Sequence, residues 1–162
     1  MEGRKVKTLA RLIASVAICQ IAGIMGSLFT APAISTWYAH LRKPDLAPPN
    51  WVFAPVWTTL YLLMGIALFL IWNGGFERSI VRKSVSVFSV QLGLNVLWSY
   101  LFFELRSPAL GLAGIIVLWA TIVFTIALFF RLSKTSSLLL VPYLLWVTLA
   151  GYLNYMLFIL NA

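Results

Sequence analysis

Five long apolar stretches, separated by short charged segments, constrain this chain more than any other feature of its sequence. They cover about residues 12–29, 52–72, 84–103, 108–130 and 138–160. Each is long enough to cross about 30 Å of hydrocarbon as a helix, which takes roughly 20 residues. None shows the sustained apolar–polar alternation of a membrane β-barrel strand. The sequence therefore predicts an all-α integral membrane protein, a bundle of five transmembrane helices.

The composition excludes the soluble classes of protein. Of the 162 residues, 62% are hydrophobic and 10% are charged, and the mean hydropathy is +0.96. A soluble domain averages about 45–50% apolar and about 25% charged residues, so these charges are too few for a soluble surface, and so apolar a chain is not disordered. Because five spans use about 100 residues, we expect residues 1–162 to form a single membrane domain.

The positive charges lie between the spans and differ between the two sides of the membrane. On one side are the N-terminal segment and the second and fourth loops, with nine cations: Arg4, Lys5, Lys7, Arg11, Arg78, Arg82, Lys83, Arg131 and Lys134. The other side carries three: Arg42, Lys43 and Arg106. The positive-inside rule therefore predicts a cytoplasmic N-terminus and an outside C-terminus. The same rule explains the net charge of +8, and we expect no nucleic-acid partner.

The N-terminal segment has a second interpretation. A basic start, an apolar run and Ala31-Pro32-Ala33 could form a cleavable signal peptide. The apolar run is about 18 residues long, whereas a signal peptide has about 7–15. It also contains Gly23 and Gly26, small residues suited to helix contacts. These features favour a first transmembrane helix with space opened by the two glycines.

The first loop, about residues 30–50, is much longer than the others. It contains four prolines, Pro32, Pro44, Pro48 and Pro49. Its middle, residues 34–41, could form a short interfacial helix with Trp37 and Tyr38 at headgroup depth. Proline restricts its own backbone and that of its predecessor, and a long ordered loop is often a lid or binding element. We expect a Pro-rich lid; a passive connector is the alternative.

Polar and aromatic residues recur on single faces of three spans. Gln91, Asn95 and Trp98 share a face of the third span, with Ser99 beside them. Similar spacing joins residues of the second and fifth spans: Trp57 with Tyr61, and Trp146 with Ala150 and Asn154. Polar side chains inside a membrane tend to face the bundle interior or a cavity.

The depth of these residues favours a cavity. Gly26, Trp57, Asn95, Trp98, Ser99 and Asn154 all fall in the outer half, and Trp146 and Ala150 lie near the middle. Flat aromatic walls with a few amide groups suit a large, flat, apolar ligand. The alternative is that these residues only pack helices, with Asn and Gln as interhelical hydrogen-bond partners.

Other chemistry has little support in the sequence. The single cysteine, Cys19, and the single histidine, His40, exclude a disulfide framework and a Cys/His zinc site. No serine or cysteine is placed to complete a hydrolytic triad with His40 and Asp45. No charged residue lies within a span, which argues against a proton or ion pathway. We expect no metal, no cofactor and no catalytic residue.

At this point the sequence resembles a known family. One segment reads WYAHLRKP at residues 37–44, followed by PPNWVFAPVWTTLY at residues 48–61. The third span contains QLGLN at residues 91–95, and the fifth contains PYLLW at residues 142–146 and LNY at residues 153–155. These strings resemble the TspO/MBR family of tryptophan-rich sensory proteins and the mitochondrial translocator protein, or peripheral benzodiazepine receptor. The likeness covers essentially the whole chain.

The resemblance implies a five-helix bundle, usually a homodimer in the bilayer, whose ligand pocket is closed by the first loop. Family ligands include porphyrins such as protoporphyrin IX and haem, sterols in eukaryotic members, and synthetic isoquinoline carboxamides and benzodiazepines. Carried over by motif, the ligand-binding residues would be Tyr38, Pro48, Trp57, Asn95, Trp98, Ser99, Trp146 and Ala150. The implied function is a receptor or carrier in tetrapyrrole transport or stress signalling.

Two other functions stay open. Trp57 and Trp146 match tryptophans that some bacterial members use in light-dependent porphyrin breakdown, so a porphyrin-degrading enzyme is one alternative, and a scaffold with an incidental pocket is the other. The chain also departs from the family pattern. Its C-terminal sterol motif is incomplete because no cation follows Tyr155, and Leu110 stands where some members have a pocket tryptophan.

Overall fold

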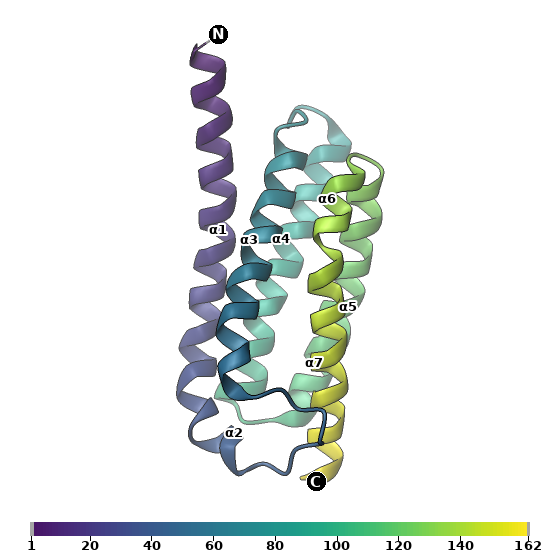
Figure 1. The fold of residues 1–162 in the computed structure, drawn as a ribbon. Helices are drawn as coiled ribbons and strands as arrows, with labels where there is room; N and C mark the ends of the chain where they lie inside the picture. Colours follow the sequence, from purple (N-terminus) through teal and green to yellow (C-terminus); the bar gives the residue numbers. More distant parts are fainter. Residues whose placement is uncertain (1, 162) are drawn as a thin grey trace.

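The computed structural model describes residues 2–161, which form an antiparallel bundle of five long helices (Figure 1). The long helices are α1 (Glu2–Ile34), α3 (Phe53–Trp72), α4 (Ser79–Ser99), α5 (Pro108–Phe130) and α7 (Val141–Leu160). Four short elements lie between them: α2 (Trp37–His40), the 3-10 turn η1 (Asn50–Val52), the π-helical turn η2 (Tyr100–Glu104) and α6 (Lys134–Leu139). Within residues 2–161, five helices are long and apolar enough to cross a membrane. The predicted all-α bundle of five transmembrane helices is confirmed, and the lid role of the first loop stays a prediction.

The helix ends follow local chemistry more than hydropathy. The fourth span matches α5 at both ends, because Ser107 caps the helix by accepting a hydrogen bond from the Leu110 N–H at 3.2 Å and Pro108 opens it. The first span is longer than predicted. The polar residues before the apolar run at residues 12–29 are helical, and α1 also continues beyond the C-terminal end of that run.

The third and fifth spans each contain an irregularity. After Ser99 the helix widens into the π-turn η2, in which the Leu105 N–H donates to the Tyr100 carbonyl, five positions earlier, at 3.0 Å. The fifth span is divided at Leu140 into α6 and α7, two residues before Pro142. A proline cannot donate a backbone hydrogen bond, which explains a break at this position.

The loops and the two termini lie at the two ends of the bundle (Figure 1). The N-terminus lies at the same end as the turns after α3 and α5, and the first N-terminal turns of α1 extend past the other helices. The first loop, the turn after η2 and the C-terminus lie at the opposite end. This is the grouping of loops from which the sequence predicted the orientation. Helix α1 packs on α3 and α4, and α5 packs on α4 and α7.

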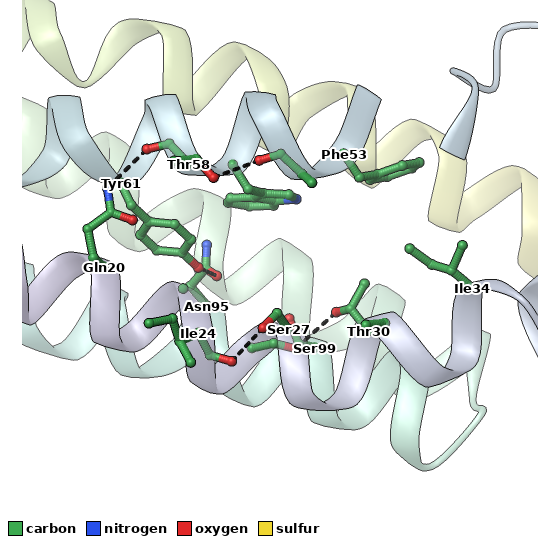
Figure 2. Close-up of a pocket in the computed structure, with 15 residues that line it drawn as sticks. Gln20, Ile24, Ser27, Thr30, Ile34, Phe53, Thr58, Tyr61, Asn95 and Ser99 are labelled. Atoms are coloured by element: carbon green, nitrogen blue, oxygen red, sulfur yellow. Dashed lines mark hydrogen bonds between the residues drawn. The ribbon is translucent and has the colours of Figure 1, made fainter. Parts of the chain in front are cut away.

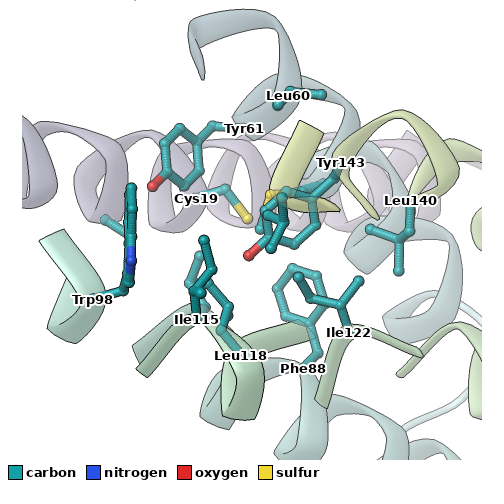
Figure 3. Close-up of a cluster of buried hydrophobic side chains, with 14 of the residues drawn as sticks. Cys19, Leu60, Tyr61, Phe88, Trp98, Ile115, Leu118, Ile122, Leu140 and Tyr143 are labelled. Carbon is teal, nitrogen blue, oxygen red and sulfur yellow. The ribbon is translucent and has the colours of Figure 1, made fainter. Parts of the chain in front are cut away.

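An apolar core of buried side chains from the long helices runs through the bundle (Figure 3). Phe88 and Phe129 stack there with their ring centroids 5.8 Å apart, and Met64 and Leu118 are fully buried. On the outside, large apolar side chains stay exposed along α1, α5 and α7. In a membrane protein these side chains face lipid, so their exposure carries no penalty.

Candidate ligand-binding site

A cavity of about 330 Å³ lies between α1, α3 and α4, in the half of the bundle nearer the first loop (Figure 2). Its walls carry apolar and aromatic side chains with scattered hydroxyl and amide groups. The lining residues are Gln20, Gly23, Ile24, Gly26, Ser27, Thr30, Ala31, Ile34, Phe53, Ala54, Trp57, Thr58, Tyr61, Asn95 and Ser99.

This first cavity opens between α1 and α3. Ser27 and Ala31 on α1 and Ala54 and Thr58 on α3 line it and are also exposed at the surface. At one end of the opening the Gln20 amide Nε2 donates to the Thr58 carbonyl at 3.1 Å and ties the two helices together. Because the surface of this helix pair lies within the membrane-spanning segments, the opening faces the bilayer.

A second, smaller cavity of about 30 Å³ lies beside the first, between α3, α4, η2 and α7. The two cavities share Thr30, Phe53, Trp57 and Ser99. The two cavities adjoin at these four residues, and the half-buried Trp57 ring contributes to the walls of both.

The structure brings together six of the eight residues that the family resemblance assigns to ligand binding. Trp57, Asn95 and Ser99 line the first cavity. Trp57, Trp98, Ser99, Trp146 and Ala150 line the second. Tyr38 and Pro48 line neither cavity, and their contact with a ligand stays a prediction.

Aromatic rings build the wall where the two cavities adjoin. Trp57 stacks on Tyr61 with centroids 5.5 Å apart and meets the edge of Tyr143 at 6.2 Å. Phe53 meets Trp146 edge-on at 6.1 Å. Indole and phenol faces at these distances gain from aromatic packing, and they offer flat surfaces to a flat ligand.

A buried chain of hydrogen bonds runs from the first cavity into the core. The Tyr61 hydroxyl donates to Asn95 Oδ1 at 2.7 Å, and Asn95 Nδ2 donates to the Tyr143 hydroxyl at 2.8 Å. The Tyr143 hydroxyl in turn donates to Gln91 Oε1 at 3.0 Å. The spacing of Gln91 and Asn95 correctly predicted a shared inward face, but nothing in the sequence showed that two tyrosines from other helices join them.

Trp98 and Asn154 belong to a separate polar group. Trp98 Nε1 donates to Asn154 Oδ1 at 3.3 Å, and Asn154 Nδ2 donates to the Pro108 carbonyl at 2.7 Å. These polar atoms already have protein partners, so the two residues join helices, as the packing interpretation of the sequence proposed for its amides. Trp98 still offers its ring to the second cavity.

The first loop is anchored by aromatic contacts. Tyr38 is buried against Phe53, Phe102 and Phe103, with centroid distances of 5.9–6.4 Å. Burial raises the pKa of the Tyr38 hydroxyl above its ordinary value of 10.0, so it is uncharged at neutral pH. Since Phe53 lines both cavities, Tyr38 is one aromatic layer away from them.

A second anchor joins this loop to the C-terminus. The Arg42 N–H donates to Asn161 Oδ1 at 2.9 Å, and Asn161 Nδ2 donates to the Arg42 carbonyl at 3.1 Å. Sequence reasoning missed Asn161 because its partners are backbone atoms 119 positions away. It also missed Gln20, whose amide inside a membrane span was a usable signal.

The side chains that line the two cavities are of the kinds found in ligand-binding pockets. None of their lining residues is charged, and their polar atoms belong to hydroxyl, amide and indole groups. Walls of this kind hold a ligand by stacking, apolar contact and a few hydrogen bonds.

Comparison with known proteins decides the family. The model of the TspO/MBR family matches residues 15–160 of the chain. The chain belongs to the TspO/MBR family. It is 46% identical over 154 residues to the tryptophan-rich protein TspO of Archaeoglobus fulgidus, covering 95% of this chain and 99% of the relative.

More distant members of the TspO/MBR family match over most of their length. Protein CrtK of Rhodobacter capsulatus is 37% identical over 143 residues, which is 88% of each chain. The translocator protein of Bos taurus is 36% identical over 137 residues, 83% of this chain and 80% of the relative. Membership of the TspO/MBR family, together with five membrane-spanning helices, supports a role as an integral membrane receptor or transporter.

Proposed function

We propose that this chain is a membrane receptor or carrier that binds porphyrin-type tetrapyrroles, such as protoporphyrin IX or haem, in the two cavities that Trp57 lines. The observation that carries the proposal is a cavity of about 330 Å³ with aromatic walls and uncharged polar groups, inside the helix bundle. Ligand pockets are typically apolar clefts of about 300–1,000 Å³ with a few placed polar groups.

The shape of the site supports a flat ligand that is larger than the enclosed space. Trp57 offers a ring face, and the opening between α1 and α3 lets part of a macrocycle extend past Ser27 and Ala54 toward the bilayer. Isoquinoline carboxamides and benzodiazepines are smaller than a porphyrin, so the first cavity would enclose a larger share of each. Apolar ligands of both kinds partition into the membrane that the opening faces.

A binding titration tests this proposal. We expect protoporphyrin IX to quench the tryptophan fluorescence of the purified protein in lipid nanodiscs, with saturation near one ligand per chain. Empty nanodiscs that contain N-acetyl-tryptophanamide serve as the control for partition and inner-filter effects. Quenching that rises linearly and equally in both samples would overturn the proposal and favour a scaffold.

One observation also favours the enzymatic alternative: two oxidisable indoles, Trp57 and Trp146, line the same cavity. Illumination of the bound complex in the presence of oxygen separates the two functions. A receptor leaves the porphyrin unchanged beyond the bleaching seen without protein. An enzyme converts it to a new product, and Trp57→Phe and Trp146→Phe would slow that conversion.

We also propose that the N-terminus lies in the cytoplasm and the C-terminus outside, because nine of the twelve Lys and Arg residues lie at the N-terminal end of the bundle. Fusions of a reporter that is active only outside the cytoplasm provide the test. We expect activity when it follows Ala162 and none when it precedes Met1. The reverse pattern would contradict the orientation.

A further inference from the structure

The buried chain Tyr61–Asn95–Tyr143–Gln91 has a direction. Every bond in it is donated away from the cavity, from Tyr61 to Asn95, from Asn95 to Tyr143, and from Tyr143 to Gln91. Among the described residues, the hydroxyl oxygen of Tyr61 accepts no hydrogen bond, although Tyr61 lines the first cavity. In this sense the chain presents a hydrogen-bond acceptor to a ligand.

The far end of the chain is unsatisfied. Gln91 is 1% exposed, and its Nε2 has no hydrogen-bond partner among the described residues. A buried amide N–H₂ without a partner costs free energy. Turning the Gln91 amide over would place Nε2 against the Tyr143 hydroxyl and leave the carbonyl oxygen unpaired, which folded proteins tolerate somewhat better.

That turn propagates along the chain. An amide fills the same space with its oxygen and nitrogen exchanged, and a hydroxyl can donate or accept. If Gln91 donates to Tyr143, then Tyr143 donates to Asn95 Oδ1, and Asn95 Nδ2 donates to the Tyr61 oxygen. All three bonds persist, but the Tyr61 hydroxyl proton is now free to point into the cavity.

We propose that this row of hydrogen bonds is a reversible polarity switch. Through it, the Tyr61 hydroxyl accepts a hydrogen bond from one ligand and donates a hydrogen bond to another. Tyr61 is the residue that contacts the ligand, whereas Tyr143 and Gln91 are positioning residues that select the sense of the chain. The inference rests on the proposed ligand site and adds what that site recognises: flat aromatic compounds with either an N–H donor or a ring-nitrogen acceptor at one edge.

Three flat tricyclic probes of similar size test the inference. Carbazole offers only an N–H donor, acridine offers only an acceptor nitrogen, and anthracene offers neither. For each probe we compare the affinity of a variant with that of the parent in the same nanodiscs, so that partition into lipid cancels. Thermal unfolding of each variant confirms that it is folded.

The parent should bind carbazole and acridine saturably. Tyr61→Phe should lower the affinity for both by about threefold to tenfold, which is one hydrogen bond, and leave anthracene unchanged. Gln91→Met removes the distal acceptor, so the Tyr143 hydroxyl proton finds an acceptor only when it is donated to Asn95 Oδ1. This favours the reversed sense: carbazole should lose about threefold to tenfold, while acridine stays within twofold.

The matched control is Ser89→Ala, which removes a hydroxyl on α4 that donates within its own helix at 2.9 Å and is exposed. It should change none of the three affinities. If Gln91→Met does not fold, Tyr143→Phe has the same predicted sign, because it leaves the Asn95 N–H₂ without an acceptor.

Two failures can be told apart. If none of the three probes binds saturably, the proposed ligand site is wrong. If anthracene binds but Tyr61→Phe changes nothing, or if Gln91→Met lowers carbazole and acridine equally, the site stands and the polarity switch is wrong.

Discussion

Helices α1 and α3 lie side by side, but the two halves of their contact differ. Toward the N-terminal end the backbones touch: a Cβ added at Gly65 would lie 2.6 Å from the Val16 Cα. Toward the first loop, the same helices line a cavity through Ser27, Ala31 and Ala54. Glycine removes the side chain and permits close approach, whereas small side chains without a large neighbour leave space. Small residues on a helix face therefore indicate contact or cavity depending on what lies opposite.

The polar groups of the two halves differ in the same way. In the N-terminal half, Ser84 and Thr125 are buried but donate to carbonyls four residues earlier in their own helices, at 2.8 and 2.7 Å. Around the cavity, Tyr61, Asn95 and Tyr143 bond across α3, α4 and α7. Polar groups that are satisfied locally add nothing to recognition. Groups that bridge helices hold the cavity in shape and keep atoms available to a ligand.

The largest effect is expected where the backbones touch. Gly65→Val places a branched side chain against the Val16 backbone, which cannot yield as a side chain can. We expect a loss of about 3 kcal/mol in the free energy of unfolding, measured by thermal or denaturant unfolding in detergent. Gly93→Val is the control, because a Cβ there meets nothing within 4 Å. Equal losses in the two variants would contradict the close packing of this half.

A smaller effect is expected at Gly23, on the boundary between the two halves. A Cβ there would lie 2.5 Å from Tyr61 Cδ2, so the ring must move. We expect Gly23→Ala to cost about 1–2 kcal/mol of stability and to weaken protoporphyrin binding by shifting a wall of the cavity. Gly93→Ala should do neither. If Gly23→Ala leaves affinity unchanged, the Tyr61 wall does not touch the ligand.

The smallest effect is expected from the first loop. The double variant Pro48→Gly, Pro49→Gly gives the open loop more conformational entropy, which favours it by about 0.4–1 kcal/mol of free energy per site. Asn161→Ala removes the two hydrogen bonds to Arg42. Each change should speed protoporphyrin dissociation about twofold to fivefold, more than it affects association, in stopped-flow measurements.

The control for the loop variants is Asn73→Ala at the opposite end of the bundle, where the side chain accepts a hydrogen bond from Arg11 at 3.4 Å. It should leave dissociation unchanged. If the loop variants also leave the rate unchanged, the loop is a passive connector and the ligand exchanges elsewhere.

Much of the fold could be predicted because the membrane limits the choices. Apolar length marks a span and charge marks a loop, so all five spans were found. The π-turn η2 could not be predicted, since the residues 100–104 that form it fit an α-helix equally well. The full length of α1 was also not predicted. Hydropathy marks only the apolar residues 12–29, whereas the helix also includes the cationic residues before them.

For the site, inward faces were predictable and partners were not. Helical spacing placed Trp57, Asn95 and Ser99 correctly, and the first cavity gathers all three. The hydrogen-bond partner of each polar side chain depends on how the helices are rotated against one another. That rotation cannot be predicted from the spacing of residues in a single sequence. Asn161 illustrates this: a polar residue at a helix end is unremarkable until the structure brings Arg42 to it.

The central claim is that the ligand binds around Trp57, and titration of tryptophan variants with protoporphyrin IX, followed by porphyrin absorbance, tests it most directly. Trp146→Phe keeps a ring but shrinks its face, so affinity should fall about threefold to tenfold. Trp57→Ala and Trp146→Ala should lose more, because buried apolar area is lost too. Trp72→Phe, at the N-terminal end of the bundle, should bind as the parent does. If both alanine variants fold and bind protoporphyrin IX as tightly as the parent, the ligand site is elsewhere and these tryptophans only pack helices.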